Sequence, residues 1–176
     1  MESIVDSLVL PGATIRHTAL LGHPKEATSD SLYHKLPTPL SFRLFEIITV
    51  FPYLSCKMNT VSLDDHAPYQ ALSYCWGSPN RSVTLRCNGY KLKISPNLAA
   101  GLRRLNAYAG EARRTRPPCF WVDQICINQE DHAERTQQVR MMRSIYQQST
   151  HTIIWLALEN GEYHLLRGYL DFTSAY

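Results

Sequence analysis

The sequence of 176 residues predicts one α/β domain whose parallel strands have helices packed against them. Three apolar segments, residues 71–76, 120–127 and 152–158, have the composition of buried strands. The two stretches between them carry apolar residues at helical spacing, and each opens with a capping residue. Strands that alternate with helices predict a parallel sheet with right-handed crossovers.

The first 40 residues show no sustained periodicity and contain scattered Pro, Gly, Ser and His. We expect them to form an irregular and partly disordered amino-terminal segment, and we place the α/β domain at residues 41–176. Within it, Phe42–Val50 (FRLFEIITV) and Thr60–Leu63 are predicted strands. We expect these two strands to form a ribbon at the edge of the sheet.

A hairpin and a capped helix follow the first parallel strand, which ends at Gly77. Two alternating runs, residues 82–87 and 90–95, flank Asn88-Gly89, a strong signal for a two-residue hairpin. We interpret this hairpin as an insertion. Ser95 is the predicted cap of the next helix, with Pro96 at its first position. The buried stripe of that helix is predicted to be Leu98, Leu102 and Leu105.

The segment from Cys119 to Tyr146 is the most informative, because Asp123 interrupts an otherwise apolar strand. A carboxylate inside such a strand is costly unless it is paired or hydrogen-bonded. We therefore expect Asp123 near the carboxyl end of the strand, facing the crevice where open α/β sheets bind ligands. The alternative is a structural aspartate that accepts backbone N–H bonds from the following turn.

The second predicted helix covers Asp131–Ser149, and Asp131 with Glu134 fits a capping box. Its predicted buried stripe is Val139, Met142, Ile145 and Tyr146. The third strand, residues 152–158, ends at Asn160-Gly161, and residues 163–176 are expected to begin another helix.

Composition excludes several classes of protein. The net charge is only +3, and the short basic cluster at residues 113–116 has no interleaved aromatic residues, so we expect no nucleic-acid partner. No apolar run approaches about 20 residues, and no secretory signal opens the chain, so we expect no membrane span and a cytoplasmic location. The five cysteines are odd in number and form no C-x-x-C pair, which favours reduced, buried thiols over a disulfide framework or a zinc site. We expect no metal.

A thiol–imidazole–acid set of Cys126, His132 and Asp123 is a further hypothesis. A reactive thiol needs an electropositive, partly exposed site. Strand alternation would place Cys126 and Asp123 on opposite faces, which disfavours this set. No glycine-rich phosphate-binding loop is present in the sequence.

Several ordered blocks resemble the fungal heterokaryon incompatibility (HET) domain over roughly residues 42–158. They begin with residues 69–77 (YQALSYCWG), continue through Asn97-Leu98 and residues 121–129 (WVDQICINQ), and end with residues 152–156 (TIIWL). Arg43-Leu44-Phe45 is similar to a short leader often found upstream. The matching residues include Tyr69, Leu72, Ser73, Tyr74, Trp76, Gly77, Trp121, Asp123, Cys126, Ile127, Asn128, Gln129, Glu134, Arg135, Gln138, Val139, Met142, Ile145 and Tyr146.

The resemblance implies a role in self/non-self recognition between fungal cells, where HET domains act as cell-death effectors. It also implies protein partners or self-association, and a flavodoxin-like sheet, because the HET family is similar to TIR domains. Some TIR domains cleave NAD with a glutamate on the helix after the third strand. Two hypotheses follow: a hydrolase with NAD as its substrate, and a module that signals by assembly without a cofactor.

The sequence departs from the family after the third strand. HET proteins commonly continue there into a segment of the form Trp-x-x-Gln-Glu, which residues 158–176 lack; Glu159 and Glu162 lie in the turn instead. We therefore expect a domain that is incomplete after its third parallel strand and inactive as an NAD hydrolase. The predicted pocket is lined by Ser73, Trp76, Asp123 and Asn128, and the candidate catalytic residues are Asp123 and Glu134.

Overall fold

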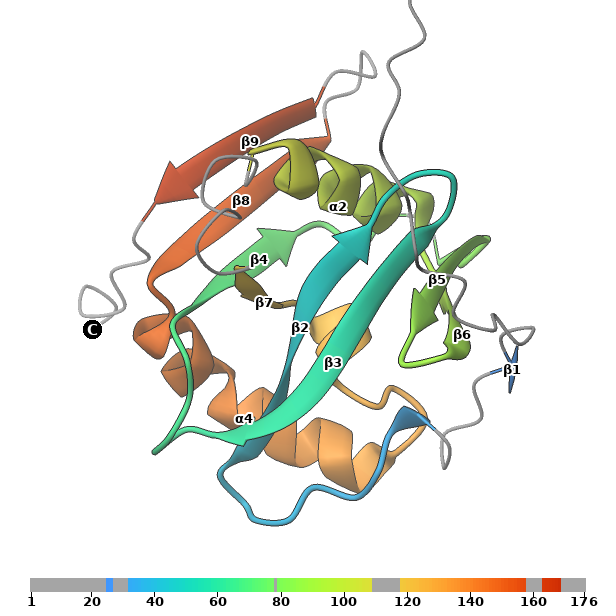
Figure 1. Ribbon diagram of the computed structural model, residues 1–176. Helices are drawn as coiled ribbons and strands as arrows, with labels where there is room; N and C mark the ends of the chain where they lie inside the picture. Colours follow the sequence, from blue (N-terminus) through green and yellow to red (C-terminus); the bar gives the residue numbers. More distant parts are fainter. Residues whose placement is uncertain (1–24, 27–31, 78, 109–117, 158–162, 169–176) are drawn as a thin grey trace, which may run out of the picture.

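The computed structural model describes residues 25–26, 32–77, 79–108, 118–157 and 163–168, and the fold is mixed α/β (Figure 1). The strands form one mixed sheet in the order β1-β6-β5-β3-β2-β7-β4-β8-β9. Their bounds are β1 Lys25–Glu26, β2 Ser41–Thr49, β3 Leu54–Ser62, β4 Tyr69–Tyr74, β5 Val83–Cys87, β6 Tyr90–Ile94, β7 Cys119–Trp121, β8 His151–Ala157 and β9 Tyr163–Gly168. The helices are α2 Pro96–Tyr108, α3 Asp123–Cys126 and α4 His132–Gln148.

The three predicted parallel strands are neighbours, as the sequence indicated. β4 lies between β7 and β8 and is parallel to both, so Ala71 is in register with Trp121 on one side and Thr152 on the other. Helices α2 and α4 cover opposite faces of these strands. Gly101 of α2 packs against the Trp155 ring, whereas the Tyr69 hydroxyl donates to the Ile145 carbonyl of α4.

The local signals around the hairpin and α2 are confirmed. Asn88 and Gly89 have φ of 48° and 85°, as the two central residues of a type I′ turn require, and β5 pairs antiparallel with β6. At the start of α2, Ser95 Oγ accepts a hydrogen bond from the Leu98 N–H at 3.2 Å. The predicted stripe of Leu98, Leu102 and Leu105 is buried.

The predicted strand over residues 120–127 is wrong beyond Trp121. The Val122 carbonyl accepts from the N–H groups of Ile125 and Cys126 at 3.2 and 2.8 Å, which closes the single turn of α3. This turn buries Ile125 and Cys126 completely. A short apolar run satisfies a strand or a buried helical turn equally well, so its periodicity could not decide between them.

The ribbon formed by β2 and β3 lies in the middle of the sheet, which corrects its predicted edge position. β2 pairs with β3 on one side and with β7 on the other, through Phe45 opposite Phe120. Phe42 and Phe45 are buried, as expected for a strand with core contacts on both faces. The sheet as a whole is therefore mixed, with the predicted parallel strands on one side of this ribbon and the predicted hairpin on the other.

The tail begins with strand β9 where the sequence predicted a helix, and the sheet therefore does not stop at the third parallel strand. β9 pairs antiparallel with β8 along its whole length and so satisfies the backbone groups that β8 would otherwise expose. Asn160-Gly161, Glu159, Glu162, the basic loop and residues 169–176 lie outside the described residues.

The buried stripe of α4 differs from the predicted one. It consists of Glu134, Gln138, Met141 and Ile145, whereas Val139 is 55% exposed. The helix is thus rotated, relative to the prediction, so that two polar side chains face the interior.

In the irregular segment before β2, Leu32 is buried and the Tyr33 hydroxyl donates to the Ile125 carbonyl at 2.9 Å. The domain boundary at residue 40 stays a prediction. Among the described residues, no helix combines the length and the apolar character that a membrane crossing requires.

Candidate functional site

Asp123 lies beyond the end of β7, as the first residue of α3, and accepts two hydrogen bonds. Trp76 Nε1 donates to Asp123 Oδ2 at 2.8 Å, and the Gln124 N–H donates to Oδ1 at 2.7 Å. Because Trp76 follows the parallel neighbour β4, the two side chains meet at the carboxyl ends of adjacent strands. The predicted position of Asp123 at the carboxyl end of its strand and its hydrogen bonding to nearby donors are confirmed, and its place in a ligand-binding crevice stays a prediction.

The environment of Asp123 favours its protonated form more than water does. Burial raises the pKa of this carboxyl, while the hydrogen bonds from Trp76 and from the Gln124 backbone and the charge of Arg81 act in the opposite direction. The Arg81 guanidinium lies 5.6 Å from the centre of the Trp76 ring. A carboxyl with a raised pKa at this place in an α/β sheet is a functional-site candidate.

Two tyrosines complete this group, which we call the aspartate cluster: Ser73, Tyr74, Trp76, Asp123 and Tyr146. Burial raises the pKa of Tyr146 to about 12 and raises that of Tyr74 further, and Asp123 contributes to both shifts. Ser73 hydrogen-bonds the Tyr146 hydroxyl. The Tyr74 hydroxyl is buried without a hydrogen-bond partner in the described structure. Both hydroxyls stay protonated at neutral pH, so Tyr74 keeps a donor that no described protein group uses.

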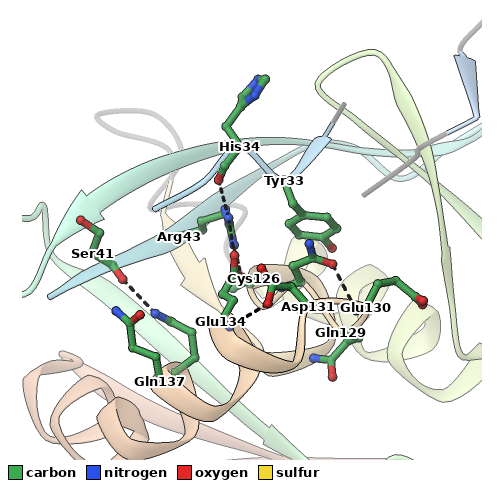
Figure 2. Close-up of polar contacts among 12 residues, drawn as sticks. Tyr33, His34, Ser41, Arg43, Cys126, Gln129, Glu130, Asp131, Glu134 and Gln137 are labelled. Carbon is green, nitrogen blue, oxygen red and sulfur yellow. Dashed lines mark hydrogen bonds and ion pairs between the residues drawn. The ribbon is translucent and has the colours of Figure 1, made fainter. Parts of the chain in front are cut away.

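A second polar group, the arginine–glutamate pair, joins β2 to α4 (Figure 2). Arg43 Nη1 lies 2.5 Å from Glu134 Oε1, and Nη2 lies 2.9 Å from Oε2. The Arg43 and Glu134 side chains are only 3% and 7% exposed. Such a bidentate pair makes two charge-assisted hydrogen bonds, which are stronger than bonds between neutral groups.

The arginine–glutamate pair also binds the surrounding backbone. Arg43 donates to the carbonyls of Cys126 and His34 at 3.1 and 2.8 Å, and Glu134 accepts from the Asn128 N–H at 2.7 Å. Both carboxylate oxygens of Glu134 therefore have hydrogen-bond partners within the protein. The predicted capping box forms only in part: Asp131 Oδ1 accepts from the N–H groups of residues 133 and 134, but Glu134 turns inward.

A cavity of about 660 Å³ lies beside this pair and contains Asn128 in its lining. It is lined by Tyr33, His34, Lys35, Leu36, Asn128, Asp131, Ala133, Glu134 and Gln137. Ser73, Trp76 and Asp123 are not part of that lining. The structure thus brings three of the four predicted pocket residues together, whereas Asn128 lines a cavity to which those three do not contribute.

The thiol–imidazole–acid hypothesis fails on geometry and on burial. Cys126 is completely buried, and this burial raises the pKa of its thiol. His132 lies at the exposed start of α4, where its Nδ1 is 2.8 Å from Arg135 Nη2. In the part of the chain that the structure describes, no group of three or more His, Cys, Asp or Glu side chains could hold a metal ion.

Several motif residues have structural tasks. Gly77 has φ of +64°, a conformation that glycine adopts without strain. Gln138 Nε2 donates to the Ser41 carbonyl of β2 at 2.9 Å, and Gln129 Nε2 donates to the Asp123 carbonyl at 2.9 Å. Sequence reasoning gave no role to Arg43 or Arg81. An arginine inside the apolar run FRLFEIITV was the available signal for Arg43.

Comparisons with known proteins agree with these motifs. The sequence model of the family described as "Heterokaryon incompatibility protein (HET)" matches residues 69–172, which is more than half of the chain. The chain is also 36% identical over 111 residues to heterokaryon incompatibility protein 6, OR allele, of Neurospora crassa. That match covers 58% of this chain but only 16% of the relative. No solved structure matches the chain.

Proposed function

The chain belongs to the heterokaryon incompatibility (HET) family, and from this premise we propose that it acts in fungal non-self recognition as a domain that triggers regulated cell death. The family match includes the strands and helices from β4 to β9, and therefore every residue of the two polar groups except Arg43. The relative in Neurospora crassa carries the heterokaryon incompatibility name. Because the matched region is a small part of that relative, the proposal concerns the HET domain alone.

The observation that carries the proposal is the bond between Trp76 and Asp123. These residues come from two separate motif blocks, yet their side chains meet at the carboxyl ends of β4 and β7. Trp76 is 38% exposed, so the cluster can be reached from solvent. A pair of motif residues that is partly open to solvent favours contact with a ligand or partner over a purely structural task.

The topology of the central strands supports a distant TIR-like relationship as the finer description of the fold. β7, β4 and β8 run parallel, with α2 and α4 on opposite faces, as in flavodoxin-like sheets. The remaining strands enlarge this unit by antiparallel and mixed pairing.

A second candidate function is cleavage of NAD, and the position of the Asp123 carboxyl beside the partly exposed Trp76, at the carboxyl ends of β4 and β7, favours it. The charge of Glu134 is balanced by its ion pair with Arg43, so we favour Asp123 over Glu134 as the catalytic residue of such an enzyme. Nicotinamide release by the purified chain, measured beside Asp123→Ala, tests this activity. Nicotinamide release that requires Asp123 would support the enzyme hypothesis. No release above background would favour the other hypothesis, in which the domain signals by assembly.

Induced expression in a fungal host tests the main proposal. The wild-type chain should reduce colony viability, whereas Asp123→Ala and Trp76→Phe should restore it, since each removes one side of their hydrogen bond. Glu130→Gln is the matched control, because Glu130 is exposed and lies a few residues away. Thermal melts of the purified variants must show that the loss of killing exceeds any loss of stability. If killing and melting temperature fall together, Asp123 has only a structural role.

A further inference from the structure

The outer face of strands β3, β5 and β6 is basic. Ser55 is in register with Arg86, and Thr84 with Lys93, so alternation places Lys57, Arg86 and Lys93 on one face of the sheet. Lys93 Nζ donates to the Thr84 hydroxyl at 2.9 Å, which confirms that both side chains share this face. We call these three residues the basic sheet face.

Basic residues outnumber acidic ones on this face within the described part of the chain. Lys91 is in register with Arg86 and also belongs to the face, and Glu26 of β1 is in register with Lys91. Glu46 is in register with Lys57 across β2 and β3, but it accepts a bond from the Cys119 thiol and makes no ion pair with Lys57. Lys57 and Lys93 are exposed. The described aspartates and the other glutamates whose side chains are described lie on the β3–β4 turn, α3 and the start of α4.

An apolar hairpin tip adjoins the basic sheet face. The turn between β2 and β3, residues 50–53, is at the periphery of the molecule (Figure 1) and presents Phe51 with 85% of its surface exposed. Ile48, just before it, is 56% exposed. Because Leu54 is in register with Leu85, the tip lies at the same end of the sheet as Thr84 and Lys93. The Arg86 guanidinium stacks 3.9 Å above the Tyr53 ring and links the two features.

We propose that the hairpin tip and the basic sheet face together form a docking surface for an anionic lipid bilayer. Phe51 and Ile48 enter the headgroup region, while Lys57, Arg86 and Lys93 face the negatively charged lipid headgroups. Phe and Ile suit this insertion, because their apolar side chains leave water for the boundary between the headgroups and the acyl chains. Binding of this kind needs no membrane-spanning helix, because its strength depends on the apolar area buried in the bilayer and on the electrostatic attraction to anionic lipids.

The shape of the surface favours lipid over nucleic acid. Phe51 stands at a turn beyond the ends of its strands, where it can enter a bilayer but cannot form a stacking platform in line with the cations. Tyr53, which could stack on a base, is already covered by Arg86.

Sedimentation with vesicles tests the proposal on the full chain. Vesicles of phosphatidylcholine containing about one third phosphatidylserine should pellet the protein, and vesicles of phosphatidylcholine alone should not. The double change Lys57→Gln/Lys93→Gln should weaken binding about 25-fold, since each cation near an anionic surface contributes roughly fivefold. The matched control is Arg140→Gln/Arg143→Gln, which removes the same charge from exposed positions of α4 and should leave binding near the wild-type value.

The contribution of the apolar hairpin tip is tested separately, with a control variant of its own. Phe51→Ser should weaken binding about tenfold, as partial burial of a phenyl ring predicts. Val139→Ser removes an exposed apolar side chain from α4 and should have no effect. Three results would overturn the proposal: no sedimentation with anionic vesicles, equal weakening by the target and control variants, or binding of a fluorescent single-stranded oligonucleotide that depends on Lys57 and Lys93 while vesicles stay unbound.

Discussion

At the residue scale, the two candidate carboxylates have different environments although both lie in motif blocks. Glu134 makes a bidentate pair with Arg43 and also accepts a backbone N–H, so its charge is fully compensated. Asp123 has two hydrogen bonds, and the cation that acts on it, Arg81, packs against the Trp76 ring. The sequence identified both residues, but only the fold brings Arg43 from β2 to Glu134. The assignment of Glu134 as a structural residue therefore could not be derived from residues 119–146 alone.

The raised pKa of Asp123 predicts how pH affects stability. A folded state with a raised pKa binds the proton more tightly than the unfolded chain does, so the proton stabilises the fold. Relative to Asp123→Asn, the wild type should gain free energy of unfolding as pH falls from neutral. The gain is fully present below the ordinary pKa of 3.8 and is lost as pH rises through the raised value. Urea unfolding of both proteins between pH 4 and 7.5 measures this difference, and a difference that shrinks on acidification would contradict it.

Replacing Glu134 with Gln should destabilise the protein strongly. The change leaves the buried Arg43 without its counter-charge, which typically costs about 3–5 kcal/mol. The exposed Glu130→Gln change should stay within about 0.5 kcal/mol. Denaturant unfolding of the two variants measures both values. The double variant Arg43→Met/Glu134→Leu should be more stable than Glu134→Gln, because no unpaired charge remains buried. The reverse order would show that the bonds of this pair to the Cys126, His34 and Asn128 backbone outweigh the cost of the unpaired charge.

At the element scale, the sequence predicted those elements whose signals are local. The Asn88-Gly89 turn and the Ser95-Pro96 helix start each depend on two adjacent residues, and both are correct. Two errors arose where tertiary contacts decide. Residues 123–126 form a helical turn because this buries Ile125 and Cys126, and residues 163–168 form a strand because they pair with β8. Neither contact is visible in the periodicity of a short segment.

Helix α4 gives a direct test of its observed orientation. Val139 is exposed, so Val139→Ser should change the free energy of unfolding by no more than about 0.5 kcal/mol, although periodicity predicted it to be buried. Ile145→Ala should cost about 2–5 kcal/mol, because that side chain is fully buried. Asp131→Ala should cost about 1 kcal/mol through loss of its two capping bonds. Urea denaturation ranks the three variants. A large effect of Val139→Ser would show that α4 is rotated relative to the structure.

At the scale of the whole molecule, β2 connects two groups of strands. On one side lie β3, β5, β6 and β1, and on the other lie β7, β4, β8 and β9. The predicted edge ribbon missed this position because strand neighbours depend on contacts distant in sequence: β2 and β7 are more than 70 residues apart. The candidate site and the basic sheet face therefore lie on different groups of strands of one sheet. Whether the two groups of strands unfold together depends on the pairing of β2 with β7, which we call the β2–β7 joint.

The central position of β2 predicts a single cooperative unfolding transition. The Phe45 side chain is buried, pairs with Phe120 across the β2–β7 joint and has its ring centre 5.9 Å from that of Phe120. Phe45→Ala should therefore lower the free energy of unfolding by about 3–5 kcal/mol. Native-state hydrogen exchange should show this same loss in the slowest amides of β5 and of β8, although the two strands lie on opposite sides of the joint. Exchange that accelerates in only one of these strands would show that the two groups fold independently.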